Sequence, residues 1–381
     1  FSRLEVKKYI FKNNLKHDLP ASLVVFLVAL PLCLGIALAS GAPLFAGLLT
    51  GVIGGVVVAT FSGSQLSVSG PAAGLTVIVL GAITQLGSYP TFLMALLLAG
   101  AIQFIFGLIK AGSVSSYFPS SVIQGMLAAI GLTLIINQLP YILGIDPSEY
   151  SMAAITSGAN QLGIAALVIG VLSLGIQIFW PKFKKLSSIP APLAVVIVGV
   201  VLSYFFKQTA YAIDPRQMVA IPEFSGWNEF SGLFMMPDFS TIVNPQVWVV
   251  AGTLAIVASL ETLLGIEAVD KLDKKKRTSP PNKELIAQGI GNMASGMLGG
   301  LPMTSVIVRS SANANSGAKT KMSAIFHGCW LLLSLLFIPG LINMIPLAGL
   351  AAVLIFTGYK LTRVDLYKHM YHKGWDQFVP F

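Results

Sequence analysis

The chain has 381 residues, of which 55% are hydrophobic and only 10% are charged. About a quarter of the residues of a typical soluble domain are charged, so this composition excludes an ordinary soluble protein. The formal net charge of +9 would indicate nucleic-acid binding only if the basic residues formed one solvated surface, and they are instead spread along the chain, so we expect an integral membrane protein with no nucleic-acid partner.

Residues 1–17 are too charged and too interrupted for a signal peptide. Their apolar positions recur at helical spacing, which predicts an amphipathic helix lying on the cytoplasmic surface of the bilayer. These positions are Leu4, Val6, Ile10, Phe11 and Leu15. We expect this segment to precede a transmembrane domain at residues 18–359.

Apolar stretches of the length that crosses a bilayer, about twenty residues, recur along the transmembrane domain and are separated by Gly, Pro and Ser clusters. The predicted spans, two of them short, are 21–40, 44–62, 71–83, 91–110, 119–138, 161–180, 189–206, 246–266, 285–300, 302–315, 321–339 and 341–359. Residues 360–381 are expected to form a cytoplasmic linker that leads to a further transmembrane helix.

The basic residues set the orientation, because cytoplasmic loops retain Lys and Arg. With the N-terminus in the cytoplasm, the basic loop residues fall inside, including the run at residues 274–277. Only Lys207 and Arg216 fall outside, in a long loop that also carries acidic residues. We therefore predict a multi-pass protein with a cytoplasmic N-terminus.

The two short spans share one design. Strand-like residues precede Pro71, small residues and a short apolar helix follow it, and Pro302 stands in a similar setting. We place each proline in the first helical turn, where its missing N–H costs nothing. Seven spans, an odd number, separate the copies, so the second is inverted in the membrane. Such paired, interrupted segments predict a transporter binding site, whereas a kinked helix without a ligand is the alternative.

A helix that starts inside the membrane leaves its first N–H groups unpaired and carries a partial positive charge at that end. Two such ends near the midplane would bind one small anion. Small side chains let the anion approach the backbone, and Thr304 and Ser305 add hydroxyl groups. The predicted binding residues are Ser69, Gly70, Ala72, Ala73, Thr304, Ser305, Val306 and Arg309.

Arg309 is predicted to lie two turns into the second short helix and to raise the positive potential around the anion. A buried guanidinium is costly unless it faces a watery cavity or a partner. The alternative is an arginine that extends to the cytoplasmic surface.

Glu261 is the clearest acidic residue within a span, and it could take up a proton or ligate a sodium ion. Gly265 shares its helix face and leaves room for a ligand or a neighbouring backbone. Glu267 is interpreted as an interfacial charge, and His327 as a packing or hydrogen-bonded residue. Both cysteines lie in apolar spans and are interpreted as packing residues.

The sequence carries no P-loop for ATP and no His and carboxylate spacing suited to a catalytic metal. We therefore predict neither an enzyme nor a bound cofactor, apart from a proton or sodium as the coupling ion. Transport would draw on an ion or anion gradient.

Several motifs resemble the sulfate permease (SulP) family of anion transporters, from about residue 18 to the end of the chain. The motifs are residues 28–41, 65–79, 282–292, 301–310 and 345–351. The resemblance implies an all-α fold of fourteen helices in two inverted repeats of seven, with two half-helices preceded by short strands and with core and gate domains. It places two further helices beyond the sequence, which also lacks the cytoplasmic STAS domain of many relatives.

The same resemblance implies an anion held between the third and tenth helices. Arg309 matches the arginine of the tenth helix, although Val308 stands where a serine is frequent. Glu261 matches an acidic residue that couples transport to protons in some relatives and to sodium in others. Gly265 replaces a threonine of sodium-dependent bicarbonate carriers, which weakens the sodium interpretation.

The residues of the two half-helix motifs are similar to those of bacterial family members associated with carbonic anhydrase. The resemblance thus implies a bacterial plasma-membrane homodimer with a functional link to carbonic anhydrase. The resulting hypothesis is secondary active transport of a small inorganic anion, bicarbonate before sulfate, by alternating access. The alternatives are an anion exchanger, a passive anion channel, and a nucleobase-type symporter of the same architecture.

Overall fold

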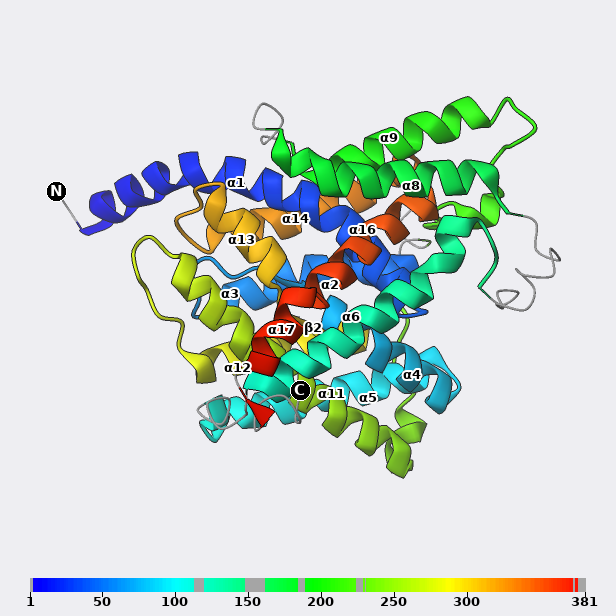
Figure 1. Cartoon of the computed structure of the whole chain (residues 1–381). Coiled ribbons are helices and arrows are strands. Elements are labelled where there is room, and N and C mark those ends of the chain that lie inside the picture. The colour runs from blue at the N-terminus through cyan, green and yellow to red at the C-terminus, as the bar shows by residue number, and fades with distance from the viewer. Residues whose placement is uncertain are drawn as a thin grey trace.

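The computed structural model describes residues 3–112, 120–147, 162–183, 189–223, 229, 231–372 and 374–375; side chains before Asn14 and a few near residues 120 and 366 are left out. The described chain is a helical bundle (Figure 1). Among the described residues, six helices are long and apolar enough to cross a membrane, and four shorter apolar helices accompany them. These ten account for most of the spans that hydropathy predicts.

The helices that correspond to the uninterrupted predicted spans follow the predicted order along the chain. They are α1 (Arg3–Ala39), α2 (Leu44–Ile53) continued by η1 (Gly54–Val58) and α3 (Ala59–Phe61), α5 (Tyr89–Leu108), α6 (Ser120–Leu143), α8 (Ile164–Phe179), α9 (Ala191–Phe206), α11 (Pro245–Leu272), α12 (Pro281–Leu298), α14 (Met322–Phe337) and α16 (Leu347–Leu361). Short connecting elements are η4 (Trp180–Lys182), η6 (Pro215–Gln217), η7 (Phe239–Val243), α15 (Pro339–Ile342) and α17 (Val364–His372).

Several helix ends differ from the expectation: α6 runs to Leu143 and not to residue 138, and α16 begins at Leu347 and not at residue 341. α11 runs to Leu272 and not to residue 266, because its last turns are amphipathic and carry an exposed pair, Glu267 with Lys271, at 2.8 Å. α1 begins at Arg3 and continues without a break into the first span. The surface position expected for residues 1–17 stays a prediction, since most of their side chains lie outside the described part.

The two interrupted segments each consist of a short strand and a half-helix. β1 (Ser69–Pro71) is followed by η2 (Ala73–Leu75) and α4 (Thr76–Leu86), and β2 (Met303–Ser305) by α13 (Ile307–Asn315). The strands pair antiparallel, with Gly70 opposite Thr304. This pairing satisfies non-helical backbone inside the protein, the condition under which a membrane fold tolerates it. The antiparallel ladder also sends the two half-helices in opposite directions.

The placement of the two prolines was wrong. Pro71 ends β1 and Pro302 precedes β2, so neither lies in a helical turn. A residue that precedes proline is biased toward extended backbone, which favours a strand at this point over a helix start. The helices begin only at Ala73 and Ile307.

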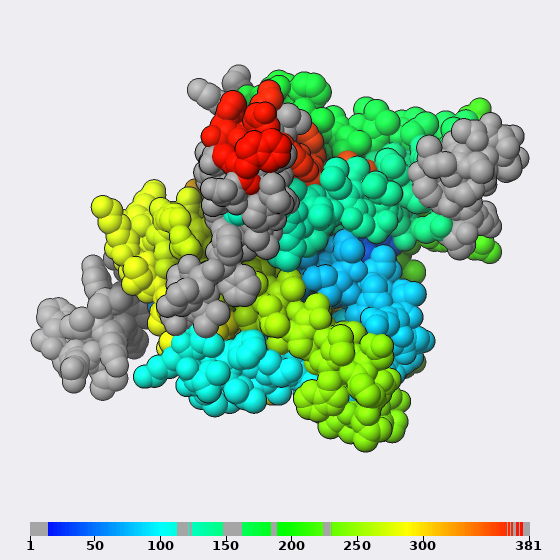
Figure 2. Space-filling view, turned by 60° about the horizontal axis from the view of Figure 1, so that its bottom comes forward, coloured from blue at the N-terminus to red at the C-terminus, as the bar shows by residue number. Residues whose placement is uncertain are grey.

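The helices pack in two groups. α5 packs on α11 and α12, and α1 packs on α2, α13 and α14; we call this the core group. α6, α8, α9 and α16 pack on one another and form the gate group. Figure 1 shows α8 and α9 at one side of the bundle and α5 and α11 at the opposite side. In Figure 2 the cyan segment of α5 and the yellow-green segment of α11 lie toward the bottom, and the green segments of the gate group lie toward the top.

Exposed apolar side chains cover the outer helices of the gate group, as expected for a surface in contact with lipid. Leu172 on α8 and Phe205 on α9 are 47% and 67% exposed. Inside the core group, α5 and α12 approach so closely that a Cβ at Gly100 or Gly289 would meet the backbone of the other helix. Glycines allow such close approach in membrane bundles. The contact fixes α12, which carries the polar side chains that hold the ladder.

Candidate functional site

The strand ladder divides the predicted binding residues into two sets. Residues directly opposite each other in an antiparallel pair point to the same face, and successive residues point to opposite faces. Gly70 and Thr304 therefore share one face, which we call the arginine face. Ser69 and Ser305 share the other, the serine face. All four residues are buried.

The side chain of Arg309 lies on the arginine face. A Cβ on Gly70 would collide with Nη1 of Arg309, so the glycine makes room for the guanidinium. Nη2 donates a long hydrogen bond, 3.4 Å, to the carbonyl oxygen of Pro71. Arg309 thus crosses from α13 to the end of β1. Because α13 begins at Ile307, Arg309 is its third residue and lies in the first turn, not two turns in.

The guanidinium is deeply buried and its charge is not neutralised by the protein. Arg309 is 0% exposed, which contradicts the alternative of an arginine that reaches the cytoplasmic surface. Nε and Nη1 have no hydrogen-bond partner among the described residues, nor does Oγ1 of Thr304. No acidic side chain of the described part forms an ion pair with Arg309. A buried charge of this kind is costly, and an anion would offset that cost.

Two further buried side chains lie beside Arg309, Cys33 from α1 and His327 from α14. Both are 0% exposed. His327 is packed inside the protein, one turn after Ala324 on α14. Cys33 and Cys329 are both free thiols, as expected for packing residues. Neither neighbour of Arg309 supplies the carboxylate that an internal ion pair would need.

The N-terminal ends of the half-helices lie next to the ladder. The first N–H groups of each half-helix, counted from Ala73 of η2 and from Ile307 of α13, have no preceding helical turn to donate to, and both ends are partially positive. Ala72 is buried, whereas Ala73 and Val306 are partly exposed. Ala73 packs against a cluster formed by Ile36 of α1, Leu134 of α6 and Leu354 of α16. The start of the first half-helix, at η2, therefore contacts helices of the gate group.

On the serine face, both hydroxyls already bond to protein groups. Ser69 Oγ accepts a hydrogen bond from Nε2 of Gln288 at 2.6 Å, and the hydroxyls of Ser67 and Ser305 lie 2.6 Å apart. These contacts hold β1 and β2 in place. Ser305 thus contributes backbone geometry at this face, and Thr304 is the residue with an uncommitted hydroxyl.

A row of polar side chains on α12 supports the ladder, and sequence reasoning assigned it no role. Asn292 accepts from Met303 N at 2.8 Å and donates to Met303 O at 3.2 Å and to Gln103 Oε1 at 2.8 Å. Glu284, 0% exposed, accepts from Ser62 Oγ at 2.6 Å and from Gln288 at 3.3 Å. Glu284, Gln288 and Asn292 recur every fourth residue, a spacing that marks one helix face. Polar residues at this spacing within an apolar span are the sequence signal that could have identified the supporting role of α12.

α11 brings its acidic residue to the start of α4. The carboxylate of Glu261 lies against Gly74, where an added Cβ would be 2.7 Å from Oε1, and Oε2 has no partner among the described residues. One turn later, Gly265 lies against the backbone of Ser305. α11 therefore contacts both interrupted segments. Glu267 is exposed and paired with Lys271, in agreement with its interpretation as a surface charge, and its position at the membrane interface stays a prediction.

No cluster of three His, Cys, Asp or Glu side chains occurs in the part of the chain that the structure describes. A sodium ion at Glu261 would thus need backbone or hydroxyl oxygens to complete its coordination, since hard cations prefer oxygen ligands. A proton would need only the carboxylate.

A family model described as the sulfate permease family matches residues 15–379. YvdB of Bacillus subtilis (strain 168), provisionally named a sulfate transporter, is 30% identical over 376 residues, which are 95% of this chain and 68% of YvdB. Bicarbonate transporter BicA of Picosynechococcus sp. is 30% identical over 370 residues, or 93% of this chain and 63% of BicA. The chain spans about two thirds of the length of these relatives.

Solved structures share the fold. The transmembrane domain of a cyanobacterium bicarbonate transporter BicA superposes with a TM-score of 0.84 at 25% identity, covering 96% of this chain and 94% of that one. The overall structure of SLC26A9 gives 0.83 at 19% identity, covering 98% and 62%. The predicted fold class, a mostly helical membrane fold with half-helices preceded by short strands, is confirmed.

Proposed function

The chain belongs to the sulfate permease family of anion transporters, and on this basis we propose that it is a secondary active transporter of a small inorganic anion, with bicarbonate favoured over sulfate. The observation that carries the proposal is Arg309, a fully buried guanidinium with two unpaired nitrogens beside the starts of two half-helices. An anion at this point would compensate the arginine and would accept from the N–H groups of both helices.

We place the anion between Ala73 and Val306, the partly exposed ends of the two interrupted segments. Arg309 and Thr304 approach from the arginine face of the ladder. Ala72 and Gly70 keep the space small and allow close approach to the backbone, and Ser69 and Ser305 hold the strands. In this assignment the eight residues predicted from the sequence divide into those that touch the anion and those that shape its site.

Charge balance supports bicarbonate. One buried guanidinium matches one negative charge, and bicarbonate is a monoanion whose O–H group can donate to a hydroxyl oxygen such as Oγ1 of Thr304. Sulfate carries two charges and only acceptors, so it would be less well compensated here. The relatives named BicA are bicarbonate transporters, and their similarity extends over nearly the whole of this chain.

Glu261 is our proposed coupling residue. Its carboxylate lies against Gly74, close to where the anion would bind. The anion and the carboxylate would then be two negative charges in one region, and a proton or sodium ion on Glu261 would neutralise the carboxylate. We favour the proton, because Gly265 offers no side-chain oxygen to a sodium ion one turn away. Movement of the core group against the gate group would then expose the loaded site to either side in turn.

The remaining assignments follow the same proposal. The protein would lie in a bacterial plasma membrane with its N-terminus in the cytoplasm and would act as a homodimer. A carbonic anhydrase would be its functional partner, because that enzyme interconverts carbon dioxide and bicarbonate.

Uptake into proteoliposomes of the full-length protein tests the proposal. Radiolabelled bicarbonate and sulfate are supplied with a proton or a sodium gradient imposed separately. We expect saturable, gradient-driven bicarbonate uptake that Arg309→Gln abolishes and that Arg363→Gln, at an exposed arginine, leaves unchanged. Flux that does not saturate would identify a channel, uptake only against a counter-anion would identify an exchanger, and uptake of a neutral nucleobase would refute the anion site.

A further inference from the structure

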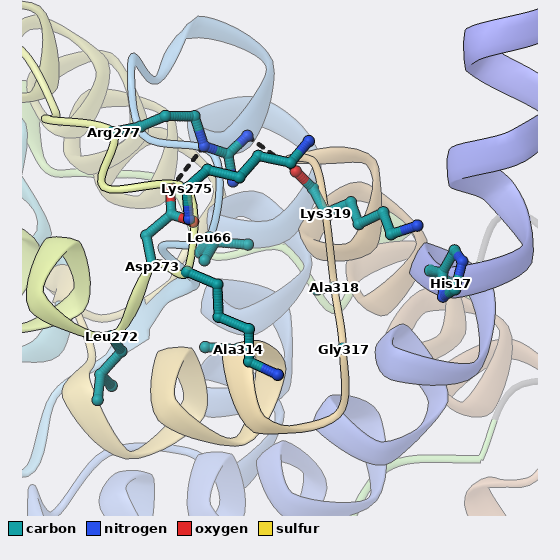
Figure 3. Close-up of a pocket in the computed structure, with 11 residues that line it drawn as sticks. His17, Leu66, Leu272, Asp273, Lys275, Arg277, Ala314, Gly317, Ala318 and Lys319 are labelled. Atoms are coloured by element: carbon teal, nitrogen blue, oxygen red, sulfur yellow. Dashed lines mark hydrogen bonds and ion pairs between the residues drawn. The ribbon is translucent and has the colours of Figure 1, made fainter.

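A second cationic site lies on the cytoplasmic side, outside the ladder. A cavity of about 300 Å³ opens between the start of the α1 span, the loop after α11 and the loop after α13. Its basic residues come from all three stretches, as Figure 3 shows. They are His17, Lys274, Lys275, Arg277 and Lys319. We call this cavity the basic pocket.

The walls of the basic pocket are fixed by hydrogen bonds. Asp273 accepts from the backbone N–H of Lys275 at 2.9 Å and from Nε of Arg277 at 2.5 Å. Nη1 of Arg277 donates to the carbonyl oxygen of Lys319 at 2.9 Å, which joins the two loops (Figure 3). Asp18, 1% exposed, accepts from the backbone N–H of Lys319 at 2.7 Å. These hydrogen bonds thus fix the two loops that carry most of the basic side chains.

The basic pocket carries a surplus of positive charge. Arg277 is paired with Asp273. The ammonium groups of Lys274, Lys275 and Lys319 have no acidic partner among the described residues. Three like charges around one cavity repel one another, and an anion with several oxygens would relieve that repulsion by accepting from more than one of them.

The position and floor of the basic pocket indicate which anion fits. The membrane spans of α1 and α11 end on this side, at Asn14 and Leu272. Basic clusters at such a membrane boundary attract anionic headgroups. The lining also contains the apolar residues Leu66, Leu272 and Ala314, which we call its floor. A cationic rim over an apolar floor suits an amphiphilic phosphate ester better than a fully hydrated inorganic ion.

We propose that the basic pocket binds a phosphate-bearing anion, at a site separate from the transport site. The phosphate oxygens accept from Lys275 and Lys319, and the remainder of the ligand rests on the apolar floor. The phosphate could belong to the headgroup of an anionic membrane lipid or to a soluble compound. Nδ2 of Asn313 donates to the carbonyl oxygen of Leu66 at 3.0 Å, so the floor is also the junction between α13 and the segment that leads into β1.

The test measures equilibrium binding to the full-length protein in detergent. The probes are a radiolabelled short-chain phosphatidylglycerol and radiolabelled inorganic phosphate, with short-chain phosphatidylcholine as the zwitterionic control. The pocket variant is Lys275→Gln with Lys319→Gln. The matched control is Lys182→Gln with Lys283→Gln, which removes two exposed lysines elsewhere on the side assigned to the cytoplasm. Lys275→Arg with Lys319→Arg keeps the charge and checks that the loops tolerate substitution.

Each basic residue near an anionic surface contributes roughly a fivefold factor, so the pocket variant should bind about thirtyfold more weakly. The matched control should change less than about twofold, and the arginine variant should retain binding. Saturable binding of phosphatidylglycerol without phosphate binding identifies a lipid headgroup, and competition by inorganic phosphate identifies a soluble ligand. Equal losses in the pocket variant and the matched control, or no saturable binding of either probe, would overturn the proposal. None of these readouts depends on transport.

Discussion

Replacing Gly70 by alanine perturbs the arginine face in a defined way. The added methyl group would overlap Nη1 of Arg309, so the guanidinium has to move by at least about 1 Å to relieve the overlap. At an effective dielectric constant of about 20, two unit charges about 4 Å apart attract by about 4 kcal/mol, and about 5 Å apart by about 3.3 kcal/mol. The difference of about 0.8 kcal/mol corresponds to an affinity lower by about fourfold.

The assay is the KM for anion uptake into proteoliposomes by Gly70→Ala, compared with Gly81→Ala as the matched control. Gly81 lies in α4, and an added Cβ there meets nothing within 4 Å. We expect KM to rise about fourfold in Gly70→Ala and to stay unchanged in Gly81→Ala. If both variants keep the parental KM, the guanidinium does not lie next to the bound anion and the reasoning is refuted.

Three further substitutions follow from the site. Asn292→Ala removes two hydrogen bonds to Met303 and one to Gln103 and leaves buried groups unpaired. Thermal unfolding should therefore show a loss of about 2–4 kcal/mol, whereas an unchanged Tm would mean that α12 does not hold β2. Glu261→Gln should keep saturable anion binding but lose accumulation driven by a cation gradient; full accumulation would refute its coupling role. Glu267→Ala breaks only an exposed ion pair, so the free energy of unfolding should change by less than about 0.5 kcal/mol. A larger loss would show that the end of α11 is packed more tightly than its exposure indicates.

Hydropathy and the two proline-containing segments were enough to predict the helical spans and the paired half-helices. These features are local, since an apolar stretch of sufficient length has few alternatives in a membrane. The helix starts were not predictable in the same way. Whether Pro71 begins a helix or ends a strand depends on the presence of a partner strand, and that partner lies more than two hundred residues away.

The candidate site shows the same division between local and long-range information. Residue types near the two prolines indicated an anion site, and all of the predicted binding residues belong to the ladder or to the segments that follow it. Strand register determines which of Thr304 and Ser305 lies on the arginine face of the ladder, and a single sequence does not define that register. Gln288 and Asn292 hold the ladder by hydrogen bonds. The sequence shows these polar residues at helical spacing in an apolar span, but only tertiary packing determines the groups to which they bond.

The central claim is that one anion binds between the starts of α4 and α13, next to Arg309. The most direct measurement is a crystal structure of the full-length protein with bromide, whose anomalous scattering locates a monovalent anion without ambiguity. The account predicts an anomalous peak within about 4 Å of the Arg309 guanidinium, a reach typical of charged pairs, and close to the backbone of Ala73 and Val306. Bromide bound only elsewhere, with no peak near Arg309, would contradict it.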